Sequence, residues 1–551
     1  MRAAPLLQFA SFLYQVSAAP NQFHPQALTS TTNSPKTSTT TASANVATCS
    51  GNSASDRSTW CSYSISDNYY DTVPDTGVTR EYWLDLTSVT VSPDGYERNA
   101  LVVNGSIPGP TLEADWGDTV VVHVTNSLTV NGTSIHFHGI RQNFTNPQDG
   151  VTSITQCPTA PGESITYTWR ATQYGTTWYH SHFALQAWEG VFGGIIIHGP
   201  SSSNYDEDLG LIFLNDWSHE TADALYTYAQ VEGPPTLDNG LINGTNVYGE
   251  DGWANQTGSR FEVQVDEGSS YRLRLVNGAI DTFFKFSVDN HTMTVMAMDL
   301  VPIVPYETTV LSIGIGQRYD VVITMNQGDV ASDFWLRAIP QVACSDNDSV
   351  DNIKGIVHYG SSTGTPTTIG YSYVDSCDDE DASNLVPYIS QDVDDSYWTQ
   401  GESVEVKYNS ENLYRWHMNN VSMVVEWDDP TLLQVWNNST NWTDTAGVIE
   451  LPDANQWASS TSLNLSNPPR RDTAMLPESG HLVLAFKTDN PGAWLMHCHI
   501  GWHTSEGFAI QFVERLDEIR TMIDGDVLEQ NCKAWDSYAS QKDIVEDDSG
   551  I

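Results

Sequence analysis

Runs of β-branched and aromatic residues, separated by short polar turns, recur along the chain from about Cys49 onward. Gly-Asp, Asn-Gly and Pro-Gly dipeptides mark the turns between them. Apolar runs bounded by such turn residues are typical of β-strands. The clearest runs are residues 82–86, 119–124, 165–169, 194–198, 271–276 and 319–323. The pattern predicts an all-β protein with one short helix near Leu516–Met522.

The length of 551 residues exceeds one ordinary domain and suits about three. Short strands in series, joined by frequent turns, favour Greek-key β-sandwiches. A polar stretch that begins at Ser361 interrupts the strand pattern and has the composition of a linker. We therefore expect β-sandwich domains at residues 49–203, 204–362 and 385–551, with a linker at 363–384 and a tail at the C-terminus.

The N-terminus has the features of a secretory signal. Arg2 precedes an apolar run, and small residues follow at Ser17-Ala18-Ala19. We expect a signal peptide at residues 1–19 and a disordered leader, rich in Ser and Thr, at residues 20–48. Twelve Asn-x-Ser/Thr sequons favour a secreted, extracellular glycoprotein. They begin at Asn104, Asn131, Asn143, Asn243, Asn255, Asn290, Asn347, Asn420, Asn437, Asn438, Asn441 and Asn464.

The net charge of −46 disfavours binding to nucleic acid and to anionic membranes. No stretch after the signal is long and apolar enough to span a membrane. The seven cysteines are an odd number, so in an oxidising compartment six can pair and one remains free or binds a metal. Cys498 is the expected unpaired cysteine because its neighbours are potential ligands.

The tripeptide His497-Cys498-His499 is the strongest chemical signal in the chain. In a strand, successive side chains face opposite ways, so the two imidazoles face one side and the thiolate faces the other. Two more His-x-His pairs lie upstream, at His136/His138 and His180/His182, whereas about 0.4 such pairs are expected by chance. Thiolate with imidazole is a ligand set that favours copper, and six paired imidazoles suit a polynuclear copper cluster.

Cys498 and His503 have the Cys-x4-His spacing of a mononuclear blue-copper site. Phe508 occupies the place where an axial methionine could come, and its phenyl ring cannot coordinate a metal; it also fits ordinary core packing. The unpaired histidines are expected to be structural. This expectation applies to His123, His198, His219, His291, His358, His417 and His481.

Five longer motifs and the C-terminus resemble the laccases, multicopper oxidases with three cupredoxin domains, and most closely the ascomycete type. The motifs are Asn104-Gly-Ser-Ile-Pro-Gly-Pro-Thr, Ile135-His-Phe-His-Gly-Ile, Trp178-Tyr-His-Ser-His-Phe, Arg470-Arg-Asp-Thr-Ala-Met-Leu-Pro and the stretch from Thr488 to His503; the chain ends in Asp548-Ser-Gly-Ile. The resemblance implies three consecutive cupredoxin-like β-sandwiches. It also implies a monomer that oxidises phenols, lignin phenols among the possibilities, with dioxygen.

The resemblance implies roles for individual residues. His136 resembles a type 2 copper ligand, Cys498 and His503 resemble the type 1 site, and the type 3 ligands match His138, His180, His182, His497 and His499. Disulfides are implied for Cys49–Cys61, Cys157–Cys532 and Cys344–Cys377. Asp281 matches a carboxylate that accepts the phenolic proton, although an ordinary surface aspartate remains open. Asp149 matches a carboxylate that assists proton delivery, although a turn aspartate before Gly150 remains open.

One motif of the family is absent. A third-domain His-Pro-x-His-x-His-Gly would supply one ligand to each copper type, but the chain passes from Trp457 to Ala458 between intact flanking motifs. We therefore expect the third domain to lack a strand segment, and the chain as written to have little or no laccase activity. Loss of a core strand also exposes a sheet edge.

Three hypotheses follow. The first is a secreted laccase whose sequence lacks an exon. The second is a catalytically impaired, secreted copper-binding glycoprotein without three ligand histidines. The third is a related multicopper oxidase that acts on ferrous iron or ascorbate, which Asp281 and the C-terminus disfavour.

Overall fold

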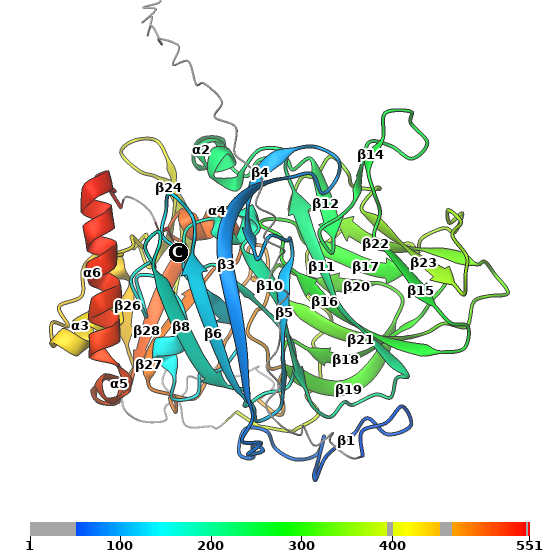
Figure 1. The fold of residues 1–551 in the computed structure, drawn as a ribbon, viewed down its shortest axis with the longest axis horizontal. Helices are drawn as coiled ribbons and strands as arrows, with labels where there is room; N and C mark the ends of the chain where they lie inside the picture. Colours follow the sequence, from blue (N-terminus) through cyan, green and yellow to red (C-terminus); the bar gives the residue numbers. More distant parts are fainter. Residues whose placement is uncertain (1–50, 394–400, 452–464, 547–548, 551) are drawn as a thin grey trace, which may run out of the picture. The chain divides into compact units, whose positions relative to one another are not determined.

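The fold was analysed in a computed structural model that describes residues 51–393, 401–451, 465–546 and 549–550. Strands dominate these residues, and the helices are few (Figure 1). The sheets fall into three groups in chain order. The segments expected to be a signal peptide and a leader, and the Trp457–Ala458 junction, lie outside the described residues.

The first group contains two four-stranded sheets, ordered β4-β3-β6-β8 and β5-β10-β9-β7. Strand β6 alternates between half-buried and buried positions, and its Val120, Val122 and Val124 enter the core between the sheets. The elements are β1 (Thr59–Trp60), β2 (Tyr63–Ser64), β3 (Thr79–Val91), β4 (Arg98–Val103), β5 (Gly109–Asp115), β6 (Thr119–Asn126), β7 (His136–His138), η1 (Asn146–Gln148), β8 (Ser164–Arg170), β9 (Gly175–His180), α1 (Gln186–Glu189) and β10 (Phe192–His198).

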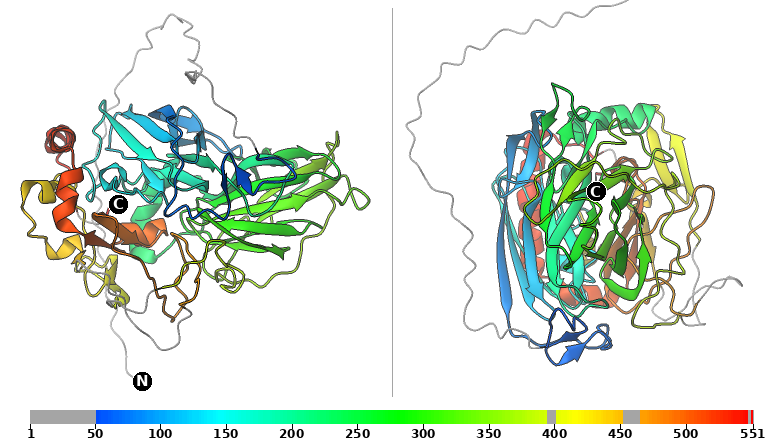
Figure 2. Two further views of the ribbon diagram at one scale, coloured as in Figure 1. Left: turned by 90° about the horizontal axis from the view of Figure 1, so that it is seen from below. Right: turned by 90° about the vertical axis from the view of Figure 1, so that its right-hand side faces the viewer.

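The second group contains a six-stranded sheet, β12-β11-β16-β21-β18-β19, and a five-stranded sheet, β15-β23-β22-β17-β20. The two sheets are stacked (Figure 2), and apolar residues from both form one core. The elements are β11 (Glu207–Trp217), α2 (Ala222–Glu232), β12 (Asn239–Ile242), β13 (Val247–Tyr248), β14 (Thr257–Gly258), β15 (Glu262–Val265), β16 (Ser270–Asn277), β17 (Phe284–Val288), β18 (Met293–Met298), β19 (Val301–Thr308), β20 (Leu311–Ile313), β21 (Arg318–Thr324), β22 (Asp333–Pro340) and β23 (Lys354–Tyr359).

The third group is smaller. Its described residues form a three-stranded sheet, β26-β28-β27, and a separate hairpin, β24-β25. The elements are β24 (Val404–Tyr408), β25 (Tyr414–Met418), α3 (Thr431–Asn437), η2 (Asp444–Ala446), β26 (Val448–Glu450), β27 (Gly492–His497), α4 (Gly501–Ser505), β28 (Ala509–Glu514), α5 (Leu516–Met522) and α6 (Gly525–Lys542). Helix α3 packs against α5 and α6, and the three helices share an apolar cluster with this sheet.

The expected all-β architecture is confirmed, since each of the six predicted runs lies within a strand. The predicted helix at Leu516–Met522 is confirmed as α5. Disulfides Cys157–Cys532 and Cys344–Cys377 are present. Cys61 is disulfide-bonded too, and its expected partner, Cys49, lies outside the described residues.

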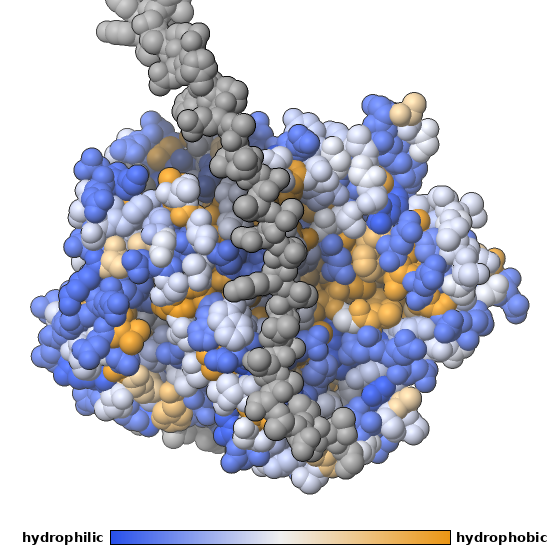
Figure 3. Space-filling view, viewed as in Figure 1, coloured by the Kyte–Doolittle hydropathy of each residue, from blue (hydrophilic) through white to orange (hydrophobic). Residues whose placement is uncertain are grey.

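The surface agrees with the acidic composition. The face drawn in Figure 3 is largely hydrophilic, with apolar patches interspersed. Among the described residues, no helix combines the length and the hydropathy needed to cross a membrane.

Candidate metal centre

The first two His-x-His pairs lie side by side because strands β7 and β9 are antiparallel neighbours. Their register places His136 opposite His180 and His138 opposite Trp178. Alternation along β7 turns Phe137 away from the two histidines and into the core, where it is fully buried. One sheet edge therefore presents imidazoles from two strands on one face.

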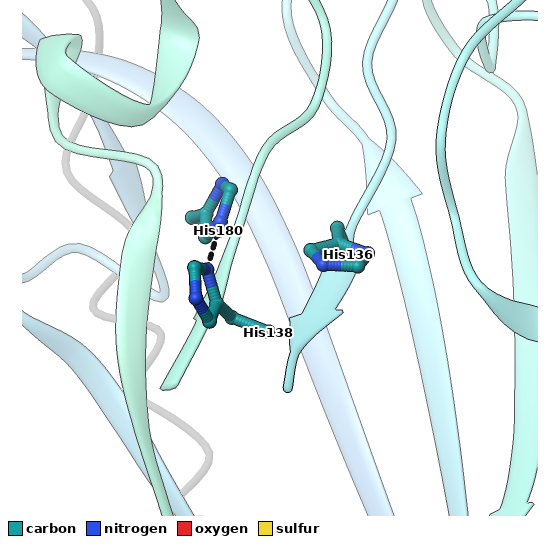
Figure 4. A group of neighbouring side chains, drawn as sticks. All are labelled: His136, His138 and His180. Carbon is teal, nitrogen blue, oxygen red and sulfur yellow. Dashed lines mark hydrogen bonds between the residues drawn. The ribbon is translucent and has the colours of Figure 1, made fainter. Parts of the chain in front are cut away.

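The third pair completes a cluster of six imidazoles. The His497 ring centroid is 5.1 Å from that of His182, and the His499 centroid is 5.0 Å from that of His138. Within the cluster, ligand nitrogens of His136, His138 and His180 lie within 4.8 Å of one another (Figure 4). Segments from the first and third groups of sheets thus converge on one point.

Three ring nitrogens of this cluster have no hydrogen-bond partner in the described part of the chain and could bind a metal. Among the described residues, Nδ1 of His182 and both ring nitrogens of His499 are buried without a hydrogen-bond partner. Burial holds the pKa of His180, His182 and His499 well below the usual range, so these imidazoles are neutral. Neutral, unpartnered imidazoles in a buried cluster are the form that binds transition metals.

Asp149 contacts the cluster at His136. Its carboxylate Oδ1 lies 3.4 Å from His136 Nδ1, and its carbonyl oxygen lies 2.8 Å from the same nitrogen. Burial opposes protonation of His136, but the Asp149 carboxylate outweighs it and raises the His136 pKa. The turn interpretation holds as well, because Gly150 has φ of +75° and a Cβ there would lie 1.8 Å from the Ile135 carbonyl oxygen.

Cys498 faces the opposite way from its flanking histidines, as the alternation predicts. Its Sγ lies 3.6 Å from His503 Nδ1, and within the described residues it is the free cysteine. Burial lowers the His503 pKa to about 4 and raises the Cys498 pKa to about 12. Phe508 stacks on Trp416 with ring centroids 5.0 Å apart, and Trp416 also lies against His503.

No third nitrogen ligand joins Cys498 and His503 among the described residues. His417 donates from Nδ1 to the Arg415 carbonyl, 3.0 Å away, and His481 is exposed. The mononuclear site is therefore incomplete in the part of the chain that the structure describes.

The sheets that contain β9 and β27 differ in one neighbouring strand. In the first domain, β9 pairs with β10 on one side and with the histidine-bearing β7 on the other. In the third domain, β27 pairs with β28 but has no described strand on its other side. The run between Gly480 and Lys487 belongs to no described strand, and its Leu482, Val483, Leu484 and Phe486 are between 40% and 56% exposed. Both features fit a missing strand segment.

Asp281 is not a surface aspartate, since it is 4% exposed. It follows Ile280, whose carbonyl accepts a hydrogen bond from Gly501 N–H at 2.9 Å, so it lies beside the loop that carries His503. Burial, followed by the Asp216 and Asp346 carboxylates, raises the Asp281 pKa to about 8.

A small, mainly apolar pocket adjoins this loop and is lined by Ile280, Trp502, Asn215 and Trp217 among others. Its volume of about 30 Å³ is enough to hold water. Asn215 Oδ1, Trp217 Nε1 and Trp502 Nε1 have no partner within the described chain, so a water there would satisfy them.

Replacement of Asp281 by Asn should stabilise the fold at pH 8 and have no effect near pH 3. The raised pKa means that folded wild-type protein holds a proton which the unfolded chain releases above about pH 4, so wild-type stability falls between pH 4 and pH 8. The upper limit of the gain is about 5 kcal/mol, from four pKa units. Urea unfolding of both proteins at pH 4, 6 and 8 measures it, and parallel curves would contradict the assignment.

Sequence reasoning missed Asp472, although its motif was recognised. Its Oδ1 lies 3.3 Å from Nε2 of His138 and 2.5 Å from Nη1 of the buried Arg318. The charged triplet that begins at Arg470 was the available signal. Asp472 connects the third domain to the cluster and to strand β21.

Comparisons with known proteins agree with this geometry. Profiles described as multicopper oxidase match residues 85–202, 208–362 and 398–518. Laccase-2 of Botryotinia fuckeliana is 46% identical over 91% of this chain and 93% of its own length, and Laccase-1 of the same fungus is 44% identical over 91% and 93%. The crystal structure of the laccase from Botrytis aclada aligns with a TM-score of 0.85 at 44% identity, over 91% of this chain and all of that one.

The alignment with Laccase-2 spans 546 positions, more than the 91% of 551 residues that this chain contributes. The relative therefore contains residues that have no counterpart here, which agrees with the lack of a described strand beside β27. The three profile matches, the identity over most of both chains and the histidine cluster between cupredoxin-like sheets agree: the chain belongs to the laccase-type multicopper oxidases, copper-dependent oxidoreductases.

Proposed function

We propose that this chain is the framework of a secreted laccase that takes single electrons from phenols of the benzenediol and hydroquinone type and reduces dioxygen to water. The observation that carries the proposal is the six-histidine cluster beside the Cys498–His503 pair. The names of the relatives at 44–46% identity support the reaction. The N-terminal signal and the sequons support secretion.

The cluster fits copper. Its buried, unpartnered nitrogens are the donors that a metal would satisfy, and soft Cys498 lies on the adjoining side of the same segment. His136 would hold the type 2 ion, and the other five histidines of the pairs would hold the type 3 ions. Bound copper would supply one-electron transfer and the reduction of dioxygen.

Two carboxylate residues, Asp149 and Asp281, would orient a ligand histidine and exchange a proton with the substrate. The carbonyl and carboxylate of Asp149 hold Nδ1 of His136 and so leave its Nε2 free for the cluster. At neutral pH the Asp281 carboxyl is protonated and can donate a hydrogen bond to a phenol oxygen. It can accept the phenolic proton once it ionises, toward pH 8.

The type 1 site does not fit a complete copper set among the described residues, because Cys498 and His503 have no third strong ligand. A second candidate function therefore applies to the 551-residue chain as written: a secreted copper-binding glycoprotein with impaired turnover. The lack of a described strand on the outer side of β27 favours it.

Expression with the native N-terminus in a fungal host tests the proposal. Protein with a completed third domain, recovered from the medium, should consume oxygen with hydroquinone, with about four one-electron oxidations per dioxygen, and much less with ferrous iron or ascorbate. Oxygen uptake with ferrous iron alone would refute the phenol assignment, and retention in the cells would refute secretion.

A further inference from the structure

The first and third domains repeat one structural unit. His180-Ser181-His182 lies at the end of β9, and His497-Cys498-His499 lies at the end of β27. Each strand returns through a short helix to an antiparallel partner, where Phe192 pairs with His180 and Ala509 pairs with His497. The separation is twelve residues in both cases. Each partner strand also pairs in parallel with a third, β10 with β5 and β28 with β26.

This register makes Ser181 the counterpart of Cys498, and Gln186 the counterpart of His503. Both pairs are in contact. Ser181 Oγ donates a hydrogen bond to Gln186 Oε1 at 2.9 Å, where Cys498 Sγ lies 3.6 Å from His503 Nδ1. In the first domain, two uncharged polar residues, Ser181 and Gln186, therefore occupy the positions that Cys498 and His503 occupy in the third domain.

A third side chain converges on the same point. Thr133 Oγ1 donates to Gln186 Oε1 at 2.9 Å, and Gln186 Nε2 donates to the Gly132 carbonyl at 2.7 Å. Thr133, Ser181 and Gln186 are all less than 5% exposed. Three convergent groups are the number that a trigonal blue-copper site requires. Thr133 comes from the chain before β7, Ser181 from the residue after β9, and Gln186 from the first position of α1.

We propose that Thr133, Ser181 and Gln186 are the first domain's counterpart of a type 1 copper set, closed by hydrogen bonds instead of a metal, and that they position the histidine cluster. Thr133 lies three residues before His136, and Ser181 lies between His180 and His182. The network therefore ties together the two segments that supply four of the six imidazoles. A fully satisfied buried network is rigid, and groups behind metal ligands set the orientation of those ligands. The proposal rests on the type 1 assignment of Cys498 and His503.

Replacement of Gln186 by Met tests the positioning role. Methionine has similar length but cannot join Thr133 to Ser181, so affinity of the cluster for Cu(I), measured by competition with a chromogenic chelator, should fall about 10-fold or more. Gln186→Glu keeps the acceptor oxygen and should retain more affinity than Gln186→Met. The control is Gln434→Met, which removes a buried glutamine with two hydrogen bonds in the third domain.

A structural role alone predicts a different result. Gln186→Met would then unfold at lower urea concentration, as Gln434→Met would, with Cu(I) affinity unchanged, and the proposal would be overturned. These affinities are measured without turnover, so they hold whether or not the chain oxidises phenols.

A gain of metal binding tests the equivalence itself. In a Cys498→Ser background, Thr133→His, Ser181→Cys and Gln186→His together should create one Cu(II) site with intense thiolate-to-copper absorption in the visible. A folded variant, checked by circular dichroism, that lacks this absorption would overturn the equivalence. The single Gln186 variants decide the positioning role whether or not the triple variant folds.

Discussion

Phenol oxidation by the copper-loaded 551-residue chain will be at least about 100-fold slower than oxidation by a variant with a completed third domain. Changes behind metal ligands already cost about 10- to 100-fold, so the absence of one direct ligand at each copper type should cost more. The completed variant carries the corresponding segment of Laccase-2 from Botryotinia fuckeliana between Trp457 and Ala458. The measurements are hydroquinone-dependent oxygen uptake, copper per chain and blue absorption.

A matched control distinguishes the effect of restoring the strand from the effect of restoring its copper ligands. The same insertion with its three expected histidine ligands changed to Ala should pair with the free edge of β27 and cover the apolar run at Leu482–Phe486, yet restore no turnover. Binding of a hydrophobic dye should fall in both insertion variants. Blue colour and full phenol turnover in the unmodified chain would refute the argument.

The strands could be predicted because apolar alternation reflects burial directly. The helix α6 was missed, although Leu528, Cys532 and Trp535 have helical spacing, because the other positions along it are mostly polar. The six paired histidines could be predicted as a group from their spacing, since alternation places each pair on one face. Their convergence across two domains required the structure.

Other site features depend on contacts that no local pattern contains. Asp281 is buried because Asp216 accepts hydrogen bonds from the backbone N–H groups of Ile280, Asp281 and Thr282, and holds that loop against the third domain. Thr133, Ser181 and Gln186 are unremarkable in sequence until the two His-x-His units are aligned with each other. The repeat itself was the signal that sequence reasoning left unused.

Replacement of Asp472 by Ala should lower the free energy of unfolding by about 2–4 kcal/mol. Arg318 is fully buried, and its Nη1 and Nη2 lie 2.5 and 2.6 Å from the two oxygens of Asp472. Without this carboxylate, the guanidinium retains Asp299 at 3.4 Å, which Arg471 also engages, so one buried charge loses most of its compensation. Urea denaturation of the metal-free protein measures the loss.

Glu518→Ala is the matched control, because Glu518 pairs with Arg515 at 2.7 Å on the surface and its loss should cost no more than about 1 kcal/mol. Arg318→Met combined with Asp472→Leu should recover part of the stability, since no unpaired charge then remains buried. Equal losses for Asp472→Ala and Glu518→Ala would show that solvent compensates Arg318. Asp472 would then act on the cluster only through its contact with His138, and its replacement should alter Cu(I) affinity without altering the fold.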